Sequence, residues 1–162
     1  MAAEFSANLE QTVAANGSVI FTASPVPCTR GLIYHRDESG IFRLASPSTL
    51  GCYGQGCNCG CSNGRMLSTV FSVAVSANVA IPEGGTVGPI QFALAQDGEI
   101  DPSSTMIVTP AAVGDYWNIS TQILVEVTWI CRCASVSLRN VGTDPALIQN
   151  VNMVIDYLGL RR

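Results

Sequence analysis

The strongest constraint on this chain is an alternation of apolar and small polar residues between Leu67 and Ile81. The apolar residues fall on one parity, and these are Leu67, Phe71, Val73, Val75, Val79 and Ile81. The polar residues on the other parity are Ser68, Ser72, Ser76 and Asn78. Successive side chains of a strand point to opposite faces, so this pattern predicts a long strand of an antiparallel sheet with one face packed on a core.

Shorter stretches of the same kind recur along the chain and are separated by turn signals. They are Ser18–Ala23, Leu32–Arg36, Ile41–Ala45, Ile90–Ala95, Met106–Val108, Ile119–Val127, Trp129–Leu138 and Val151–Leu158. Asp97-Gly98 is a hairpin dipeptide, because a tight turn needs positive φ angles that Asp tolerates and Gly adopts freely. No sustained helical stripe competes with this pattern. The sequence therefore predicts an all-β protein, an antiparallel β-sandwich of the jelly-roll type, as one domain over residues 1–162.

Two segments stand apart from the strand pattern. Residues 1–17 are a candidate N-terminal arm, and residues 46–65 form a Gly-rich and Cys-rich loop inserted between two strands. The loop contains Cys52, Cys57, Cys59 and Cys61. Four thiolates can close a tetrahedral shell around a structural zinc ion, although the single-residue spacing of the last three departs from the usual Cys-x-x-Cys pairs. Disulfides and free thiols are the alternatives, and the sequence leaves all three open.

The charged residues exclude several functions. All eight basic residues are Arg, against twelve carboxylates and one His. A chain without Lys has neither a P-loop lysine nor a Schiff-base nucleophile, and no nucleophile motif accompanies His35. We expect no enzyme activity, and no cofactor apart from the zinc alternative. The negative net charge disfavours nucleic acid, and no apolar run is long enough for a membrane span. Met1–Gln11 lacks the pattern of a signal peptide, so folding in a cytoplasm is expected.

The composition also indicates assembly. Charged residues make up 12% of the chain, about half of the ordinary quarter. A chain that is so poor in charge is expected to bury surface between subunits. The residues that we assign to the core or to a trimer interface are Phe71, Val73, Val75, Val151, Met153, Ile155 and Tyr157.

Several segments resemble a family of uncharacterised structural proteins from tailed bacteriophages and prophages of gut Firmicutes. They are Phe5–Asn8, Gln11–Val13, Pro25–Cys28, Tyr34–Gly40, Ala80–Ile90, Ser104–Val113 and Ile148–Asn152. That family is similar in turn to the trimeric jelly rolls of the tumour-necrosis-factor and complement-head type. The resemblance covers most of the chain, except for the segment Cys52–Cys61, and it brings no catalytic residue.

The resemblance implies a homotrimer on the virion surface, assembled in the cytoplasm of a bacterial host. The expected role is capsid decoration or a head fibre, with the major capsid protein or another virion protein as partner. The alternative is a receptor-binding or glycan-binding module of an adhesin, a tail-associated protein or a spore-surface knob. Tyr116 and Trp117, near a hairpin end, are then the candidate contacts for a host-surface glycan or protein.

Overall fold

The computed structural model describes residues 2–28, 31–35, 39–46, 68–128 and 133–161. The elements in chain order are β1 (Ala2–Ala7), β2 (Gln11–Val13), β3 (Ala23–Val26), β4 (Ile33–His35), β5 (Phe42–Ala45), β6 (Ser68–Ala80), β7 (Ile90–Gln96), β8 (Glu99–Ile100), the 3₁₀ turn η2 (Pro102–Ser104), β9 (Met106–Val108), β10 (Trp117–Val127), β11 (Cys133–Asn140) and β12 (Ala146–Arg161). Apart from the single turn η2, every regular element in these residues is a strand. No helix in the described ranges is long and apolar enough to cross a membrane.

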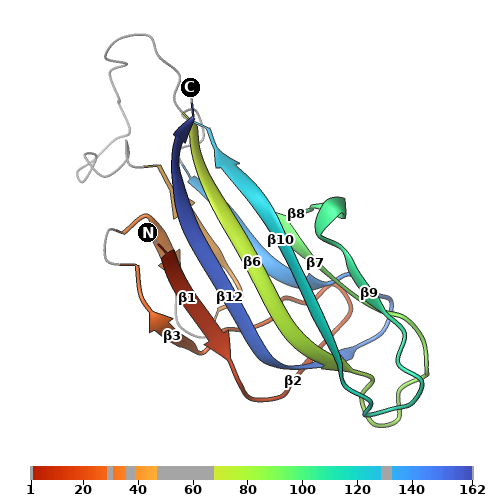
Figure 1. The fold of residues 1–162 in the computed structure, drawn as a ribbon. Coiled ribbons are helices and arrows are strands. Elements are labelled where there is room, and N and C mark those ends of the chain that lie inside the picture. Colours follow the sequence, from red (N-terminus) through yellow and green to blue (C-terminus); the bar gives the residue numbers. More distant parts are fainter. Residues whose placement is uncertain (1, 29–30, 36–38, 47–67, 129–132, 162) are drawn as a thin grey trace, which may run out of the picture.

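The strands form two antiparallel sheets that pack face to face (Figure 1). Sheet A has the order β10-β6-β12-β1-β3, and β2 also pairs with β12. Sheet B has the order β4-β5-β11-β7-β8, and β9 also pairs with β7. The all-β sandwich expected from the sequence is confirmed.

The pairing of strands is nested along the chain. The early strand β1 pairs with the last strand β12, β5 pairs with β11, β6 pairs with β10, and β7 pairs with β9. Such nesting arises when one long antiparallel hairpin is rolled so that its halves fall alternately into the two sheets. This connectivity is the jelly roll, so the predicted fold holds at the level of topology as well as class.

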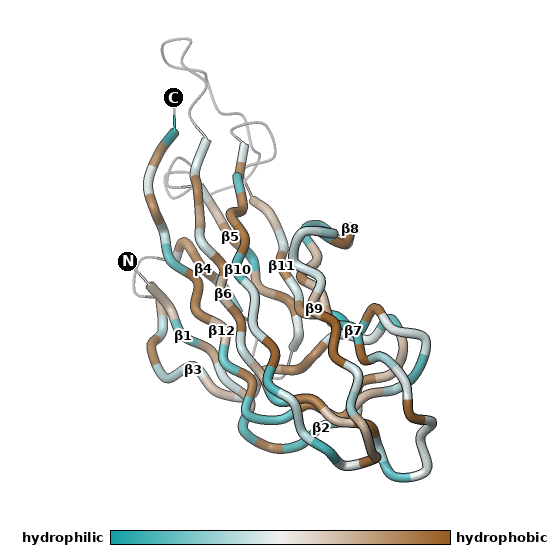
Figure 2. The backbone as a smooth tube through the Cα atoms, turned by 45° about the vertical axis from the view of Figure 1, so that its right-hand side comes forward, coloured by the Kyte–Doolittle hydropathy of each residue, from teal (hydrophilic) through white to brown (hydrophobic). Residues whose placement is uncertain are grey.

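The alternation on β6 places one parity in the core. Phe71 and Val73 have no exposed surface, whereas Ser76, on the opposite parity, is exposed. The same alternation continues on β10, where Ile123 and Val125 are buried and Leu124 between them is 66% exposed. Hydrophobic and hydrophilic residues follow one another along the backbone tube of these long strands (Figure 2). The space between the sheets is therefore filled by every second residue of each long strand.

The Asp97-Gly98 dipeptide forms the expected tight turn between β7 and β8. Its φ angles are 52° at Asp97 and 88° at Gly98, as a type I′ hairpin requires. The Asp97 carboxylate also accepts a hydrogen bond from the backbone N–H of Ser135 at 2.7 Å, which ties the hairpin to β11.

The N-terminal residues contribute to the sandwich. The candidate arm over residues 1–17 contains β1 and β2, both of which pair with β12. The strand expected at Ser18–Ala23 is reduced to isolated bridges at Ser18 and Phe21. The side chain of Gln11 takes the place of a neighbouring strand here. Its amide bonds both the N–H and the C=O of Ile20, each at 2.9 Å, so these backbone groups do not pair with another strand.

Candidate functional site

The four cysteines of the predicted zinc or disulfide site are Cys52, Cys57, Cys59 and Cys61, and they lie outside the described residues. Both flanks of this segment are anchored, because the buried hydroxyls of Ser46 and Thr69 form a hydrogen bond of 2.9 Å.

Elsewhere in the chain, Cys28 and Cys133 are half-buried free thiols. Within the described ranges, no group of three His, Cys, Asp or Glu residues could hold a metal ion.

The residues assigned to the core or to a trimer interface lie between the two sheets of one chain. Phe71, Val73, Val151, Met153 and Ile155 have no exposed surface, and Val75 retains 4%. Tyr157 is partly buried and meets Phe71 edge to face, with ring centroids 5.8 Å apart. These side chains form the core of the protomer, so a subunit that packs on sheet A would contact the opposite face.

That opposite face is uncharged over three strands. The strand register aligns Asn118, Asn78 and Gln149 in one row, Ser120, Ser76 and Asn152 in the next, and Gln122, Ala74 and Val154 in a third. We call these nine residues the neutral face. Carboxylates border it: Glu4 lies beside Val154 on β1, and Asp156 lies one row further along β12.

A shallow hollow of about 450 Å³ occupies the neutral face, and its floor consists of small residues. Ala74, Ser76 and Ser120 contribute to this floor, while Gln122, Asn152 and Val154 contribute to its sides. The amides at the sides are fixed in place: Gln122 donates to the Ser72 hydroxyl at 2.6 Å, and Asn152 donates to Glu4 at 2.6 Å. The residues that line the hollow are thus uncharged, and the Glu4 carboxylate at its border is bonded by Asn152.

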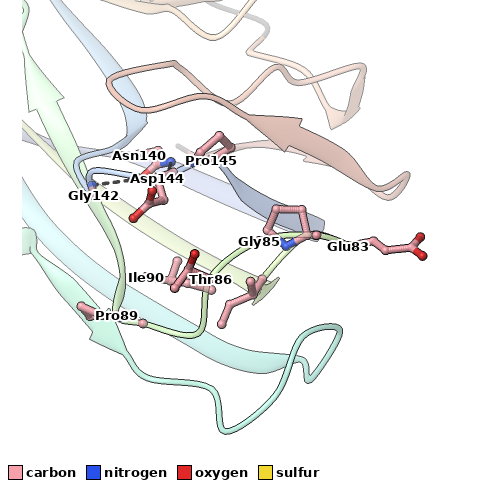
Figure 3. A pocket seen from close by; sticks show the side chains of 13 residues that line it. Glu83, Gly85, Thr86, Pro89, Ile90, Asn140, Gly142, Asp144 and Pro145 are labelled. Atoms are coloured by element: carbon pink, nitrogen blue, oxygen red, sulfur yellow. Dashed lines mark hydrogen bonds between the residues drawn. The ribbon is translucent and has the colours of Figure 1, made fainter.

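A second concave region lies at the end of the sandwich away from the C-terminus, where the chain turns after β6 and after β11 (Figures 1 and 3). We call this region the loop end. Its cavity has a volume of about 370 Å³ and is lined by residues 81–86 and 88–90 from the first turn and by Asn140, Gly142, Asp144 and Pro145 from the second. Thr86 and Asp144 point from the two walls toward the space between them, and Glu83 extends away from it (Figure 3).

Asn140 holds one wall of this cavity in shape. Its side chain is 1% exposed and donates to the carbonyls of Val13 and Asp144 at 3.0 and 2.9 Å. Its amide oxygen accepts the N–H of Gly142 at 2.9 Å. One amide therefore satisfies two backbone groups of the β11–β12 turn and one carbonyl of β2.

The aromatic candidates Tyr116 and Trp117 lie at the start of β10, and neither belongs to the residues that line this cavity. The backbone N–H of Gly114, just before them, bonds the carbonyl of Ile81 in the cavity wall at 3.0 Å. Trp117 is 45% exposed, and its indole N–H donates to Asp115 at 3.0 Å. Trp117 therefore combines a satisfied indole N–H with an accessible surface.

Tyr116 is 36% exposed, and its hydroxyl donates to the carboxylate of Glu10 in the β1–β2 loop. Desolvation and the Glu10 carboxylate raise the pKa of Tyr116 to about 12. By the register of β10, this tyrosine precedes the Trp117–Val79 pair and so lies level with Ala80. Ala80 is fully buried even though its parity is outward, which agrees with a tyrosine ring crossing the sheet at that level.

His35, the only histidine, belongs to an aromatic cluster of the core. Its ring stacks on Phe42 at 4.5 Å and meets Phe5 at 5.2 Å, and its Nε2 hydrogen-bonds the carbonyl of Ser39 at 2.9 Å. Packing among aromatic rings is a structural role. The polar residues that follow it in the sequence, 36–38, lie outside the described residues.

Sequence reasoning named Tyr116 and Trp117 as candidates and did not predict the cavity at the loop end. For the segments Glu83-Gly84-Gly85 and Gly142–Pro145, the sequence predicted turns and no binding site. Their approach to one another depends on the pairing of β6 with β12, which joins strands far apart in the sequence.

Comparison with known proteins does not place the chain in a family. No family model matches it, and no curated protein matches it. Among solved structures, the xylan-binding domain CBM22-1 of Paenibacillus barcinonensis Xyn10C is similar at 11% identity, over 96% of this chain and 93% of that one, with a TM-score of 0.35. The Podospora anserina GH26-CBM35 β-(1,4)-mannanase is similar at 10% identity, over 94% of this chain and 28% of the mannanase chain, with a TM-score of 0.31. Similarity at this level carries no conclusion about function.

Proposed function

We propose that this chain is a non-catalytic structural protein that assembles as a homotrimer through the neutral face of sheet A. The observation that carries the proposal is the absence of charge from all nine residues of that face. A solvent-exposed protein surface is ordinarily a quarter or more charged residues, whereas the centres of interfaces are depleted of charge. A face of this kind is suited to contact with another subunit.

The shape of the face supports the same role. Its floor of Ala and Ser lets a partner's backbone approach closely, and the hydrogen bonds of Gln122 and Asn152 fix its side chains before association. Side chains that are already ordered lose less entropy on binding, so more of the contact energy remains as affinity. The trimeric state itself rests on the resemblance to phage jelly-roll proteins, with which the nested strand pairing is compatible.

On this proposal the trimer is a decoration or head-fibre protein on a bacteriophage capsid. A rigid sandwich supplies the body, and loops at its ends supply contacts with the major capsid protein or other virion proteins. The low charge, the phage-like segments and the structural role of His35 support a non-enzymatic role.

The interface is tested with Ser76→Asp, which places a charge on an exposed position in the middle of the neutral face. Sedimentation equilibrium should show that the variant is a folded monomer, because three buried carboxylates would face the subunit contact. The matched control is Ala112→Asp, at an exposed position in the β9–β10 loop, which should remain a trimer. A trimeric Ser76→Asp protein with an unchanged association constant would refute this placement of the interface.

The location is tested by immunogold electron microscopy of purified phage particles with an antibody against the folded protein. Gold on the heads is the expected result. Gold confined to tails, or particles that carry none of the protein by mass spectrometry, would refute the decoration role.

A further inference from the structure

We propose that the loop end is a binding site for a neutral saccharide, with Trp117 as the stacking surface and the cavity as the pocket for a sugar ring. This site goes beyond the structural role proposed above, and its residues are not among the nine of the neutral face. The cavity is lined by the turns at the end of the sandwich (Figure 3), and Trp117 precedes Asn118 on β10, so its side chain points to the opposite face of the strand.

The aromatic part of the site is positioned before any ligand arrives. Trp117 keeps 45% of its surface exposed while its indole N–H donates to Asp115 at 3.0 Å, so the polar edge is satisfied and nearly half of the residue is accessible to a ligand. A pyranose has an apolar face of C–H groups and a rim of hydroxyls. The first packs on an aromatic face, and the second requires hydrogen-bond partners close to the ring.

Asp115 provides such a partner beside the indole. One of its oxygens accepts the indole N–H, and an ionised carboxylate has further lone pairs for a sugar hydroxyl. Hydrogen bonds from hydroxyls to a carboxylate are stronger than those between neutral groups. A stacking ring next to a carboxylate acceptor matches the two surfaces of a sugar.

The cavity lies at the same end of the sandwich as this pair, and it has the size of a small-ligand site. Its volume of about 370 Å³ lies within the range of such pockets and exceeds what one sugar ring fills. The Gly114 N–H to Ile81 C=O bond joins the segment that carries Asp115 and Trp117 directly to the cavity wall. Inside, Thr86 and Asp144 supply a hydroxyl and a carboxylate from opposite walls.

The charge of the site selects against acidic ligands. Asp144 lines the cavity and Asp115 bonds the Trp117 indole, and in the part of the chain that the structure describes no arginine lines the cavity. A sulfated or sialylated sugar would meet like charge, whereas a neutral sugar would not.

The test is binding of the full-length protein to immobilised neutral oligosaccharides of β-linked glucose, galactose, mannose and N-acetylglucosamine, with sialylated and sulfated glycans on the same surface. The proposal predicts binding to a neutral glycan, and a loss of affinity of about tenfold or more in Trp117→Ala. The matched control is Tyr34→Ala, which removes an aromatic residue that is 61% exposed on β4, and which should bind as the wild type does.

A second variant, Asp144→Ala, separates the cavity from the stacking surface and should also weaken binding. Native mass spectrometry of each sample reports the number of subunits, so a failure to assemble is distinguished from a failure to bind. Absence of binding to every neutral glycan by an assembled trimer would overturn the site, as would wild-type binding by Trp117→Ala or binding to acidic glycans alone.

Discussion

The side chain of Asn140 joins the β11–β12 turn to β2, and Asn140→Ala should therefore lower stability more than the loss of one hydrogen bond would. Its side chain makes three hydrogen bonds to backbone groups of three residues and is 1% exposed. A hydrogen bond contributes about 1 kcal/mol net, and a buried group that loses its partner costs more. We expect a loss of about 3 kcal/mol, which corresponds to a fall in Tm of roughly 6–12 °C for a chain of this length.

The assay is urea unfolding at one fixed protein concentration, since assembly contributes to apparent stability. The loss should appear as a lower midpoint with an unchanged slope. The matched control is Thr143→Ala in the same turn, whose exposed hydroxyl bonds only Asp144, and which should cost less than about 0.5 kcal/mol. If Asn140→Ala unfolds within 0.5 kcal/mol of this control, the reasoning about the turn is wrong.

Three further predictions concern the core, a close backbone contact and a titration. Phe71→Ala removes a ring with no exposed surface and should cost about 3–5 kcal/mol in the same urea assay, and a cost below 1 kcal/mol would contradict the assigned core. Gly40→Ala would place a Cβ 2.4 Å from the Val19 carbonyl oxygen, so the variant should melt at clearly lower temperature than the wild type in calorimetry. The raised pKa of Tyr116, about 12 against an unfolded value of 10.0, stabilises the fold below pH 10, and this contribution is lost as the pH rises through 12. In phenolate absorbance titrations, with Tyr116→Phe as the reference, Glu10→Gln should lower this pKa, and an unchanged titration would refute the pairing.

The regular part of the fold was predictable because alternate residues of a strand point to opposite faces, so that burial of one face appears as an alternation of apolar and polar residues. On β6 the pattern identified both the buried side chains, such as Phe71, and the outward ones, such as Ser76. The Asp97-Gly98 turn was predictable for a local reason, since few residue pairs adopt two positive φ angles at low cost.

The N-terminal strands were less predictable because their signal is not local. Ala2–Ala7 is half alanine, which favours strands weakly, and it becomes a strand through its pairing with β12 at the other end of the chain. Ser18–Ala23 has the right alternation, with Val19 and Phe21 fully buried, but the side chain of Gln11 takes the place of a neighbouring strand.

The candidate sites were predictable only in part. The alternation of residues shows which side chains share a face of a strand. It does not show whether that face packs on a second sheet or on another subunit. Val73 and Val75 therefore fitted a core and an interface equally well from sequence, and the packing of one chain places both in the core. The loop-end cavity required the convergence of two turns, which no short sequence window contains.

The central claim, that the chain assembles as a homotrimer, is tested most directly by native mass spectrometry of the purified wild-type protein without reductant. The account predicts one dominant species with the mass of three 17.1-kDa chains. The same spectrum also measures the mass per chain, which falls by two hydrogens for each disulfide formed and rises if a metal ion is bound. A spectrum dominated by the single chain at micromolar concentration would contradict the assembly and leave the neutral face as ordinary solvent-exposed surface.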